Sequence, residues 1–117
     1  FGLLTKSTIL YGSDVLSKGR YDRCYDKSLR IRRVLRAKAD ELFKKFDVLV
    51  MPACSKASFT KEALGDSIDA AYSESRYTSF ASLLGLPAIT VGGVQLVADS
   101  MNDALLLSIA DAYERGL

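Results

Sequence analysis

SFASLLGLPAITVGGVQLV, residues 79–97, is the stretch that decides the fold of this chain. Small and apolar residues lead into Gly85-Leu86-Pro87, where glycine can take the left-handed backbone conformation that ends a helix and proline prevents the helix from resuming. Two short apolar runs follow, joined by Gly92-Gly93, and a Gly-Gly pair in that setting is among the strongest local signals for a β-hairpin. The stretch therefore predicts a helix, a sharp corner and a hairpin with strands at 88–91 and 94–98.

A third strand is predicted before this stretch. Residues 47–51 form an almost continuous apolar run that Pro52 ends. A run of this kind is typical of a strand in the interior of a sheet, so we expect this strand to be central. With helices on either side, the pattern predicts an α/β fold in which a mixed sheet packs against helices. The length of 117 residues indicates a single domain, 1–117.

Four helices are predicted around these strands. The first covers about residues 3–17, and the second, from Arg20 to Phe46, is expected to be the longest. A third begins near Ser67 or Asp69, either of which can cap it, and runs to Leu84. The second helix is expected to bury residues that recur at steps of three and four, namely Tyr21, Cys24, Tyr25, Ile31, Leu35, Ala39, Leu42 and Phe46.

The fourth helix closes the chain. Asp99 or Ser100 can cap its first turn, because their side-chain oxygens accept hydrogen bonds from free backbone N–H groups. The apolar spacing predicts an inward face made of Leu105, Leu106, Ile109, Ala112 and Tyr113.

Positive charge is concentrated in one segment. Residues 18–45 hold 11 of the 16 Lys and Arg residues and four of the 14 acids, a net charge of +7, while the rest of the chain is net acidic. Such a field favours phosphate, but a basic face on an amphipathic helix is more often solvated or in contact with an acidic neighbour. No aromatic residues are expected among the exposed cations, so a stacking surface for single-stranded nucleic acid is not indicated.

The composition excludes several kinds of chemistry. The chain has no histidine, which removes Ser-His-Asp and Cys-His catalysis and the commonest zinc ligand. Cys24 and Cys54 lack the spacing of a metal site or a disulfide framework. No apolar run approaches the roughly 18 to 20 residues that span a membrane. We therefore expect no metal, no cofactor and no membrane partner, and a cytoplasmic location.

An ordered series of motifs resembles the C-terminal part of the amidase signature family, and within it the A subunits of the amidotransferases. The series starts with Phe1-Gly2 and Ile9-Leu10-Tyr11-Gly12, passes through the basic segment and Phe46-Asp47-Val48-Leu49-Val50, and continues with Leu84-Gly85-Leu86-Pro87 and Gly93-Val94-Gln95-Leu96. It covers nearly all of the chain. Since the chain also opens without Met, directly on Phe1, we expect it to be a C-terminal fragment of a longer amidase-like chain.

The resemblance implies hydrolysis of an amide by a serine nucleophile, assisted by a second serine and a lysine. Those residues belong to a Gly/Ser-rich signature that this chain lacks, so no catalytic residue is predicted here. Four serines recur along the predicted third helix, at positions 73, 75, 79 and 82, but no base accompanies them. We expect them to permit close packing or to line a pocket.

The resemblance also implies two substrate-binding positions. In the A subunits of the amidotransferases, an arginine and an aspartate bind the amino-acid part of glutamine, and these positions correspond to Thr8 and Ser75 here. Neither charge is present, and a hydroxyl does not replace a bidentate clamp. The family also has a longer loop where Gly92-Gly93 closes the hairpin directly. Both departures put glutamine in doubt as the substrate.

Three functions remain open from the sequence. The first is scaffold and substrate-pocket wall of an amidase, with the N-terminal catalytic part of the parent chain as partner and, in a parent complex, other amidotransferase subunits and tRNA. The second is a noncatalytic module on the same scaffold, which self-associates as a homo-oligomer. The third is weak RNA binding through residues 18–45.

Overall fold

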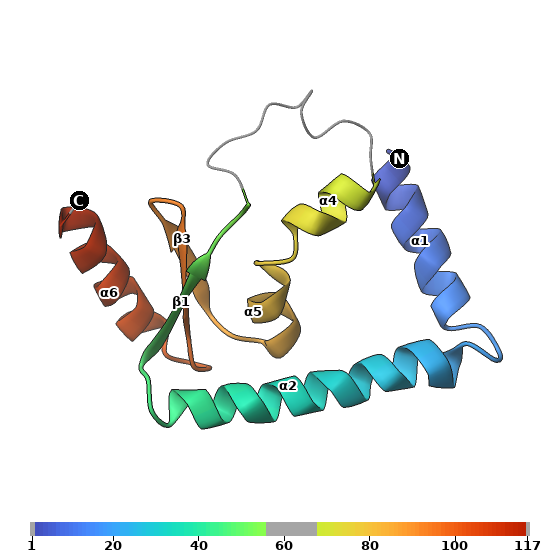
Figure 1. Cartoon of the computed structure of the whole chain (residues 1–117), viewed down its shortest axis with the longest axis horizontal. Coiled ribbons are helices and arrows are strands. Elements are labelled where there is room, and N and C mark those ends of the chain that lie inside the picture. The colour runs from blue at the N-terminus through green and yellow to red at the C-terminus, as the bar shows by residue number, and fades with distance from the viewer. Residues whose placement is uncertain (1, 56–67, 117) are drawn as a thin grey trace.

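The computed structural model describes residues 2–55 and 68–116, as helices around a small sheet (Figure 1). Its elements are, in order, α1 (Leu3–Val15), η1 (Tyr21–Asp26), α2 (Lys27–Phe43), β1 (Val48–Pro52), α4 (Ile68–Glu74), α5 (Ser79–Leu84), β2 (Ala88–Val91), β3 (Val94–Ala98) and α6 (Asp103–Gly116). The predicted α/β class is confirmed, and the three strands lie within one residue of their predicted positions.

The sheet has the order β1-β3-β2, and both pairings are antiparallel, so the described strands form an antiparallel sheet rather than the predicted mixed one. Val97 of β3 lies opposite Leu49 of β1 and Ala88 of β2. The central strand is therefore β3, and the prediction that the 47–51 run is central was wrong. Leu49 and Met51 of β1 pack against one buried cluster and Val48 against the other, while Val50 at this edge of the sheet is 68% exposed.

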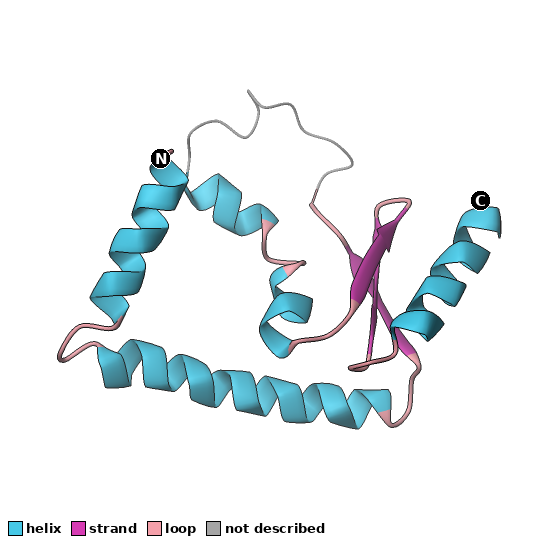
Figure 2. Cartoon of the chain, turned by 180° about the vertical axis from the view of Figure 1, so that it is seen from behind, coloured by secondary structure: helices cyan, strands magenta, loops and turns pink. Residues whose placement is uncertain are grey.

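The two faces of the sheet bury separate clusters. On one face, Val97 packs with Ala39 of α2 and with Ala81 and Leu84 of α5. On the other face, Leu96 and Ala98 pack with α6. Figure 2 shows α6 on one side of the strands and α5 on the other. The central strand thus joins both clusters, which explains why four of its five residues are buried.

The corner and the hairpin form as predicted. Gly85 has a φ of 66°, the left-handed conformation, and the Leu86 N–H donates to the Ala81 carbonyl, which closes the last turn of α5. Gly92 and Gly93 have φ angles of 57° and 81°. Positive φ at both central residues is what a two-residue hairpin turn requires, and glycine adopts it without steric cost.

The long helix forms, but it starts as a π-helical segment, η1, and buries much less than predicted. Ala39 is the one buried residue of α2, and Ile31, Leu35 and Leu42 are each at least 40% exposed. The apolar spacing was read correctly as helical. The prediction that these side chains are buried was wrong, because the side of α2 that packs against α5 is narrow and is made by Ala39 and Phe43, next to Arg36.

The predicted third helix is two helices, α4 and α5, separated by residues 75–78. In that stretch the side chains of Thr78 and Ser79 both donate to the Ser75 carbonyl, which also accepts the Ser79 backbone N–H at 2.9 Å. Asp69 lies in the first turn of α4, while Ser67 lies outside the described residues.

The last helix begins at Asp103, so the prediction that Asp99 or Ser100 caps it was wrong. Both side chains are engaged by Arg36 instead. The inward face is narrower than predicted. Leu106 and Ala110 are buried, whereas Tyr113 is 38% exposed.

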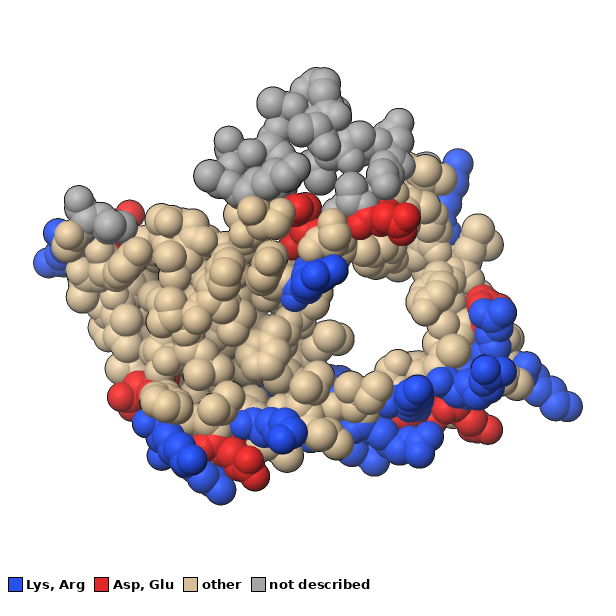
Figure 3. Space-filling view, in the orientation of Figure 1, with Lys and Arg blue, Asp and Glu red and all other residues tan. Residues whose placement is uncertain are grey.

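The chain has two unequal regions. The sheet unit, residues 36–55 and 79–116, contains every buried residue of the described chain. The arm, residues 2–35, contains none. A compact chain of this length has a radius of gyration of about 13 Å, and this one has 17.0 Å. Figure 3 shows an opening that passes between the arm and the sheet unit. Protein interiors are close-packed. The apolar side chains of the arm are not packed in this way, because no described residue of the arm is buried.

Candidate functional site

The candidate site is a groove of about 690 Å³ between α1 and α4. In Figure 1, α4 meets α1 near the N-terminal end of the chain, and the two helices diverge from there. The groove is lined by Ser7, Leu10, Tyr11, Asp14, Ile68 and Tyr72. Most of this lining is apolar or aromatic, as in the small-molecule sites of other proteins.

Thr8, one of the two predicted substrate-binding positions, lies beside this groove. Its Oγ1 donates to the Leu4 carbonyl at 2.9 Å and lies 3.5 Å from the hydroxyl oxygen of Tyr72. A threonine hydroxyl has one proton, and the Leu4 carbonyl takes it, so Tyr72 is the donor in the second contact. The neighbouring Ser7 hydroxyl likewise donates to the Leu3 carbonyl at 2.9 Å.

Ser75, the other predicted position, follows the last residue of α4 and does not line the groove. The structure brings Thr8 next to Tyr72, three residues before Ser75, rather than next to Ser75 itself. A direct contact between the two predicted positions does not occur. Tyr72 contacts α1 through this pair of hydroxyls, and no site role was predicted for it.

The predicted serine row is divided by the break between α4 and α5. Ser79 Oγ donates to the Ser75 carbonyl, and Ser82 Oγ donates to the Thr78 carbonyl at 3.4 Å. An activated serine needs a base as the acceptor of its proton, and a backbone carbonyl is not one. These two serines are therefore bonded as helix residues rather than as nucleophiles.

Ser55 differs from these serines, because it donates to a carboxylate. Its Oγ lies 2.6 Å from Glu74 Oε1, and its backbone N–H points to Glu74 Oε2 at 3.4 Å. The pair joins the residues after β1 to the end of α4. Both bonds come from one residue to one carboxylate, which is the geometry of a structural link between the sheet unit and α4.

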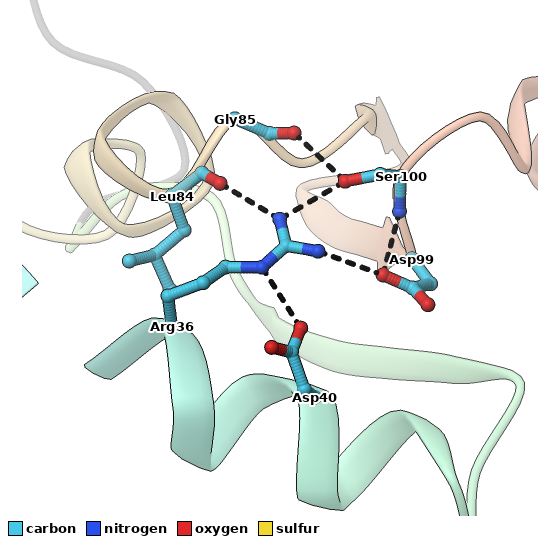
Figure 4. A network of polar contacts seen from close by, with 6 residues as sticks. All are labelled: Arg36, Asp40, Leu84, Gly85, Asp99 and Ser100. Carbon is cyan, nitrogen blue, oxygen red and sulfur yellow. Dashed lines mark hydrogen bonds and ion pairs between the residues drawn. The ribbon is translucent and has the colours of Figure 1, made fainter. Parts of the chain in front are cut away.

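A network around Arg36 was missed by the sequence reasoning (Figure 4). Its Nε donates to Asp40 Oδ1 at 2.8 Å, and one terminal nitrogen donates to the Leu84 carbonyl and to Ser100 Oγ, each at 2.9 Å. The other terminal nitrogen lies 3.2 Å from Asp99 Oδ1. Arg36 thus joins α2, the C-terminus of α5 and the loop before α6.

The network has a physical reason at the end of α5. The last carbonyls of a helix lack intrahelical partners and carry partial negative charge, so a guanidinium stabilises them. The Ser100 hydroxyl also donates to the Gly85 carbonyl at 3.3 Å. In the sequence, Arg36 is one cation among eleven in the basic segment, and no local signal separates it from the others.

The basic segment is partly neutralised in the structure. Three of its arginines form ion pairs, Arg20 with Asp14, Arg30 with Asp26 and Arg36 with Asp40 and Asp99. Tyr21 and Tyr25 are exposed and their rings lie 5.1 Å apart, so the expectation that no aromatic residue lies among the exposed cations was wrong. Their rings contact each other at a tilt of 38°.

In residues 2–55 and 68–116, no three Cys, Asp or Glu side chains gather closely enough to hold a metal ion. Over the same residues, no helix combines the length and the apolar character needed to cross a bilayer.

The chain matches known proteins over nearly all of its length. The Amidase family model matches residues 1–107. The A subunit of the glutamyl-tRNA(Gln) amidotransferase of Burkholderia vietnamiensis (strain G4 / LMG 22486) is 34% identical over 128 residues, which are 98% of this chain and 26% of the relative. The corresponding protein of Clostridium novyi (strain NT) is 33% identical over 129 residues, with the same coverage.

The structural comparison agrees with these matches. The crystal structure of the A subunit of the glutamyl-tRNA(Gln) amidotransferase from Thermotoga maritima superposes with a TM-score of 0.73 at 24% identity, over 95% of this chain and 26% of that chain. This likeness concerns the fold alone. The chain spans about a quarter of the length of the relatives it matches. On the family match and the sequence identity together, this chain belongs to the amidase family.

Proposed function

We propose that this chain forms the C-terminal part of an amidase and provides scaffold and one wall of the substrate pocket for amide hydrolysis. In this proposal, the Ser/Ser/Lys catalytic residues belong to another part of a longer parent chain. The observation that carries the proposal is the coverage, because 98% of this chain corresponds to about a quarter of an amidotransferase protein. The serines of α5 support it, since their hydroxyl protons are directed to backbone carbonyls.

The partner in this proposal is the remainder of the parent chain. The arm supports this assignment, since α1 has no buried residue and Leu10 on it is 71% exposed. An apolar helix face of this kind is stable in water only when another surface covers it. Other amidotransferase subunits and tRNA are partners of the parent complex in the same proposal, with a role in protein biosynthesis in the cytoplasm.

The experiment uses the full-length protein that contains this chain and measures ammonia release from amides. Alanine at Ser75, Ser79 or Ser82 is expected to leave kcat within about threefold, because removing a true serine nucleophile costs on the order of 10⁶-fold. A thousandfold loss in any of them would place the nucleophile in this chain and contradict the proposal. A full-length protein that hydrolyses no amide would also contradict it.

A second candidate is a noncatalytic module that self-associates through the arm. The exposed apolar side chains of the arm favour it as they favour the parent chain. Sedimentation of the 117-residue chain at several concentrations separates the two. Mass that rises with concentration supports self-association, and a strict monomer argues against it.

A further inference from the structure

A second groove, of about 410 Å³, lies where α2 passes the C-terminal end of α5. We call it the arginine groove, because Arg32, Arg33 and Arg36 line it. Figure 4 shows Arg36 on α2 and Leu84 on α5, one lining residue from each of the two helices. The arginine groove shares no lining residue with the groove between α1 and α4. It is therefore a separate surface with its own chemistry.

One face of α2 supplies most of the lining. The members are spaced as on a single helical face, namely Leu29, Arg32, Arg33, Arg36, Ala37 and Asp40. At a rise of 1.5 Å per residue, this face is about 16 Å long. An extended peptide rises about 3.3 Å per residue, so about five residues span the face.

The arginine groove lies on a different face of α2 from the exposed apolar residues. Ile31, Val34 and Leu35 line a separate hollow, which has no residue in common with the arginine groove. The proposed function assigns the exposed apolar side chains of the arm to the remainder of the parent chain. A parent chain that covers them leaves the arginine groove to another partner.

The three arginines differ in what they already bind. Arg36 donates to Asp40 and to the Leu84 carbonyl. Arg32 and Arg33 are exposed, and within the described chain neither side chain has an ion-pair or hydrogen-bond partner. Arg32 lies one helical turn before Arg36, and like charges at this spacing repel each other. An anion bound at Arg32 and Arg33 would relieve that repulsion and use their free N–H donors.

The rest of the lining favours an acidic peptide over a nucleic acid. Leu29, Ala37 and Leu84 supply aliphatic surface, and the described lining has no aromatic ring on which a base could stack. The tyrosine pair of η1 lies outside it. Asp40 places a negative charge at one end of the groove, where it repels a continuous phosphate backbone. A peptide can carry acids at some positions and an aliphatic side chain at others.

We propose that the arginine groove binds an acidic peptide segment of a partner protein. Two carboxylates of the segment, from Asp or Glu, accept hydrogen bonds from the guanidinium groups of Arg32 and Arg33, whose planar forks match a carboxylate. An aliphatic side chain of the same segment lies against the aliphatic lining. This inference goes beyond the proposed function, because peptide binding here requires no amide hydrolysis.

The test measures binding of a fluorescein-labelled pentapeptide, EAEAL with blocked ends, to the full-length protein that contains this chain. In an extended peptide its two Glu and its Leu share one face. Fluorescence anisotropy is recorded at an ionic strength of about 0.15 M, where exposed charges more than about 8 Å apart are largely screened. We expect binding that saturates, and at least tenfold weaker binding of the peptide QAQAL.

Matched variants locate the site. Arg32→Gln and Arg33→Gln are each expected to weaken binding of EAEAL at least fivefold. Arg23→Gln is the control, because Arg23 is exposed, lies outside the lining and has no ion pair in the described chain. It is expected to stay within twofold. Equal weakening by all three variants would overturn the proposal, and so would an unaltered protein that does not bind EAEAL.

Arg33→Lys separates a fitted site from a general positive field. Lysine keeps the charge and loses the bidentate fork, so we expect it to weaken binding of EAEAL at least threefold. Unchanged binding by Arg33→Lys would overturn the proposed carboxylate contact.

A single-stranded oligouridylate tests the alternative ligand at the same ionic strength. We expect it to bind at least tenfold more weakly than EAEAL. Tighter binding of the oligouridylate, lost in Arg32→Gln and Arg33→Gln, would overturn the peptide and make the groove a nucleic-acid site.

Discussion

The sheet unit and the arm both carry apolar residues at regular spacing, yet only one of them has an interior. Val97 in the sheet unit is fully buried, while Val34 in the arm is 57% exposed. The sheet unit brings three strands, α5 and α6 together, so each apolar face meets another. The arm presents its apolar face to the opening in Figure 3 and to solvent. The comparison teaches that amphipathic periodicity predicts a helix, but burial depends on a partner.

The largest effect is expected where the sheet unit is densest. Val97→Asp places an unpaired carboxylate between Ala39, Leu84 and Leu49, and we expect a loss of about 4 kcal/mol or more in the free energy of unfolding. Circular dichroism and urea denaturation of the 117-residue chain measure it. A variant that unfolds within about 1 kcal/mol of the unaltered chain would show that the sheet unit is not the core.

The next effect is expected at Arg36. Arg36→Ala removes the bonds to Asp40, the Leu84 carbonyl and Asp99. Each hydrogen bond of a charged group contributes about 1.5–3 kcal/mol before solvent screening. We therefore expect the free energy of unfolding to fall by about 2 kcal/mol. Arg33→Ala is the control, an exposed arginine without an ion pair in the described chain, and should change stability by less than about 0.5 kcal/mol. Equal urea midpoints for the two variants would mean that the network is not stabilising.

A smaller pair of effects is expected to differ in sign between the two regions. Gly93→Ala, at a φ of 81°, is expected to destabilise the hairpin by about 1 kcal/mol, although a Cβ there meets nothing within 4 Å. Gly12→Ala in α1 also meets nothing within 4 Å, and it should increase helicity and stability by about 0.5–1 kcal/mol. Thermal unfolding followed by circular dichroism compares them, and a shift in the same direction for both would contradict the turn assignment.

The smallest effect is expected for Val34→Asp in the 117-residue chain. The site is exposed, so the free energy of unfolding should change by less than about 0.5 kcal/mol, in contrast to the same substitution at Val97. In the full-length protein the change should be larger, because a covering surface would bury the carboxylate. Urea denaturation of both proteins tests this, and equal small changes in both would show that this face of α2 stays open.

The features predicted from the sequence are those that local chemistry determines. The corner at Gly85 and the Gly92-Gly93 turn follow from backbone conformations that few residues other than glycine adopt, and both were predicted correctly. The position of β1 at the sheet edge was not predicted, since it depends on which strand β3 pairs with. Nor was the Arg36 network, whose partners at Leu84 and Ser100 lie 48 and 64 residues further along the chain.

The candidate site was predicted only in part. Thr8 was singled out by position, and the structure places it beside Tyr72 at the edge of a groove. Ser75 was singled out in the same way, but the break after α4 separates it from the groove. The helical repeat of small residues predicted one continuous helix over this stretch and did not reveal the break between α4 and α5.

The order β1-β3-β2 leaves an outer edge on each of β1 and β2 without a strand partner among the described residues. The β1 edge lies beside Val50, an apolar side chain in solvent. Open edges of this kind recruit strands from other molecules, which leads to aggregation. The 117-residue chain should therefore be handled at low concentration, and attaching it to the rest of an amidase chain should raise its yield as soluble material.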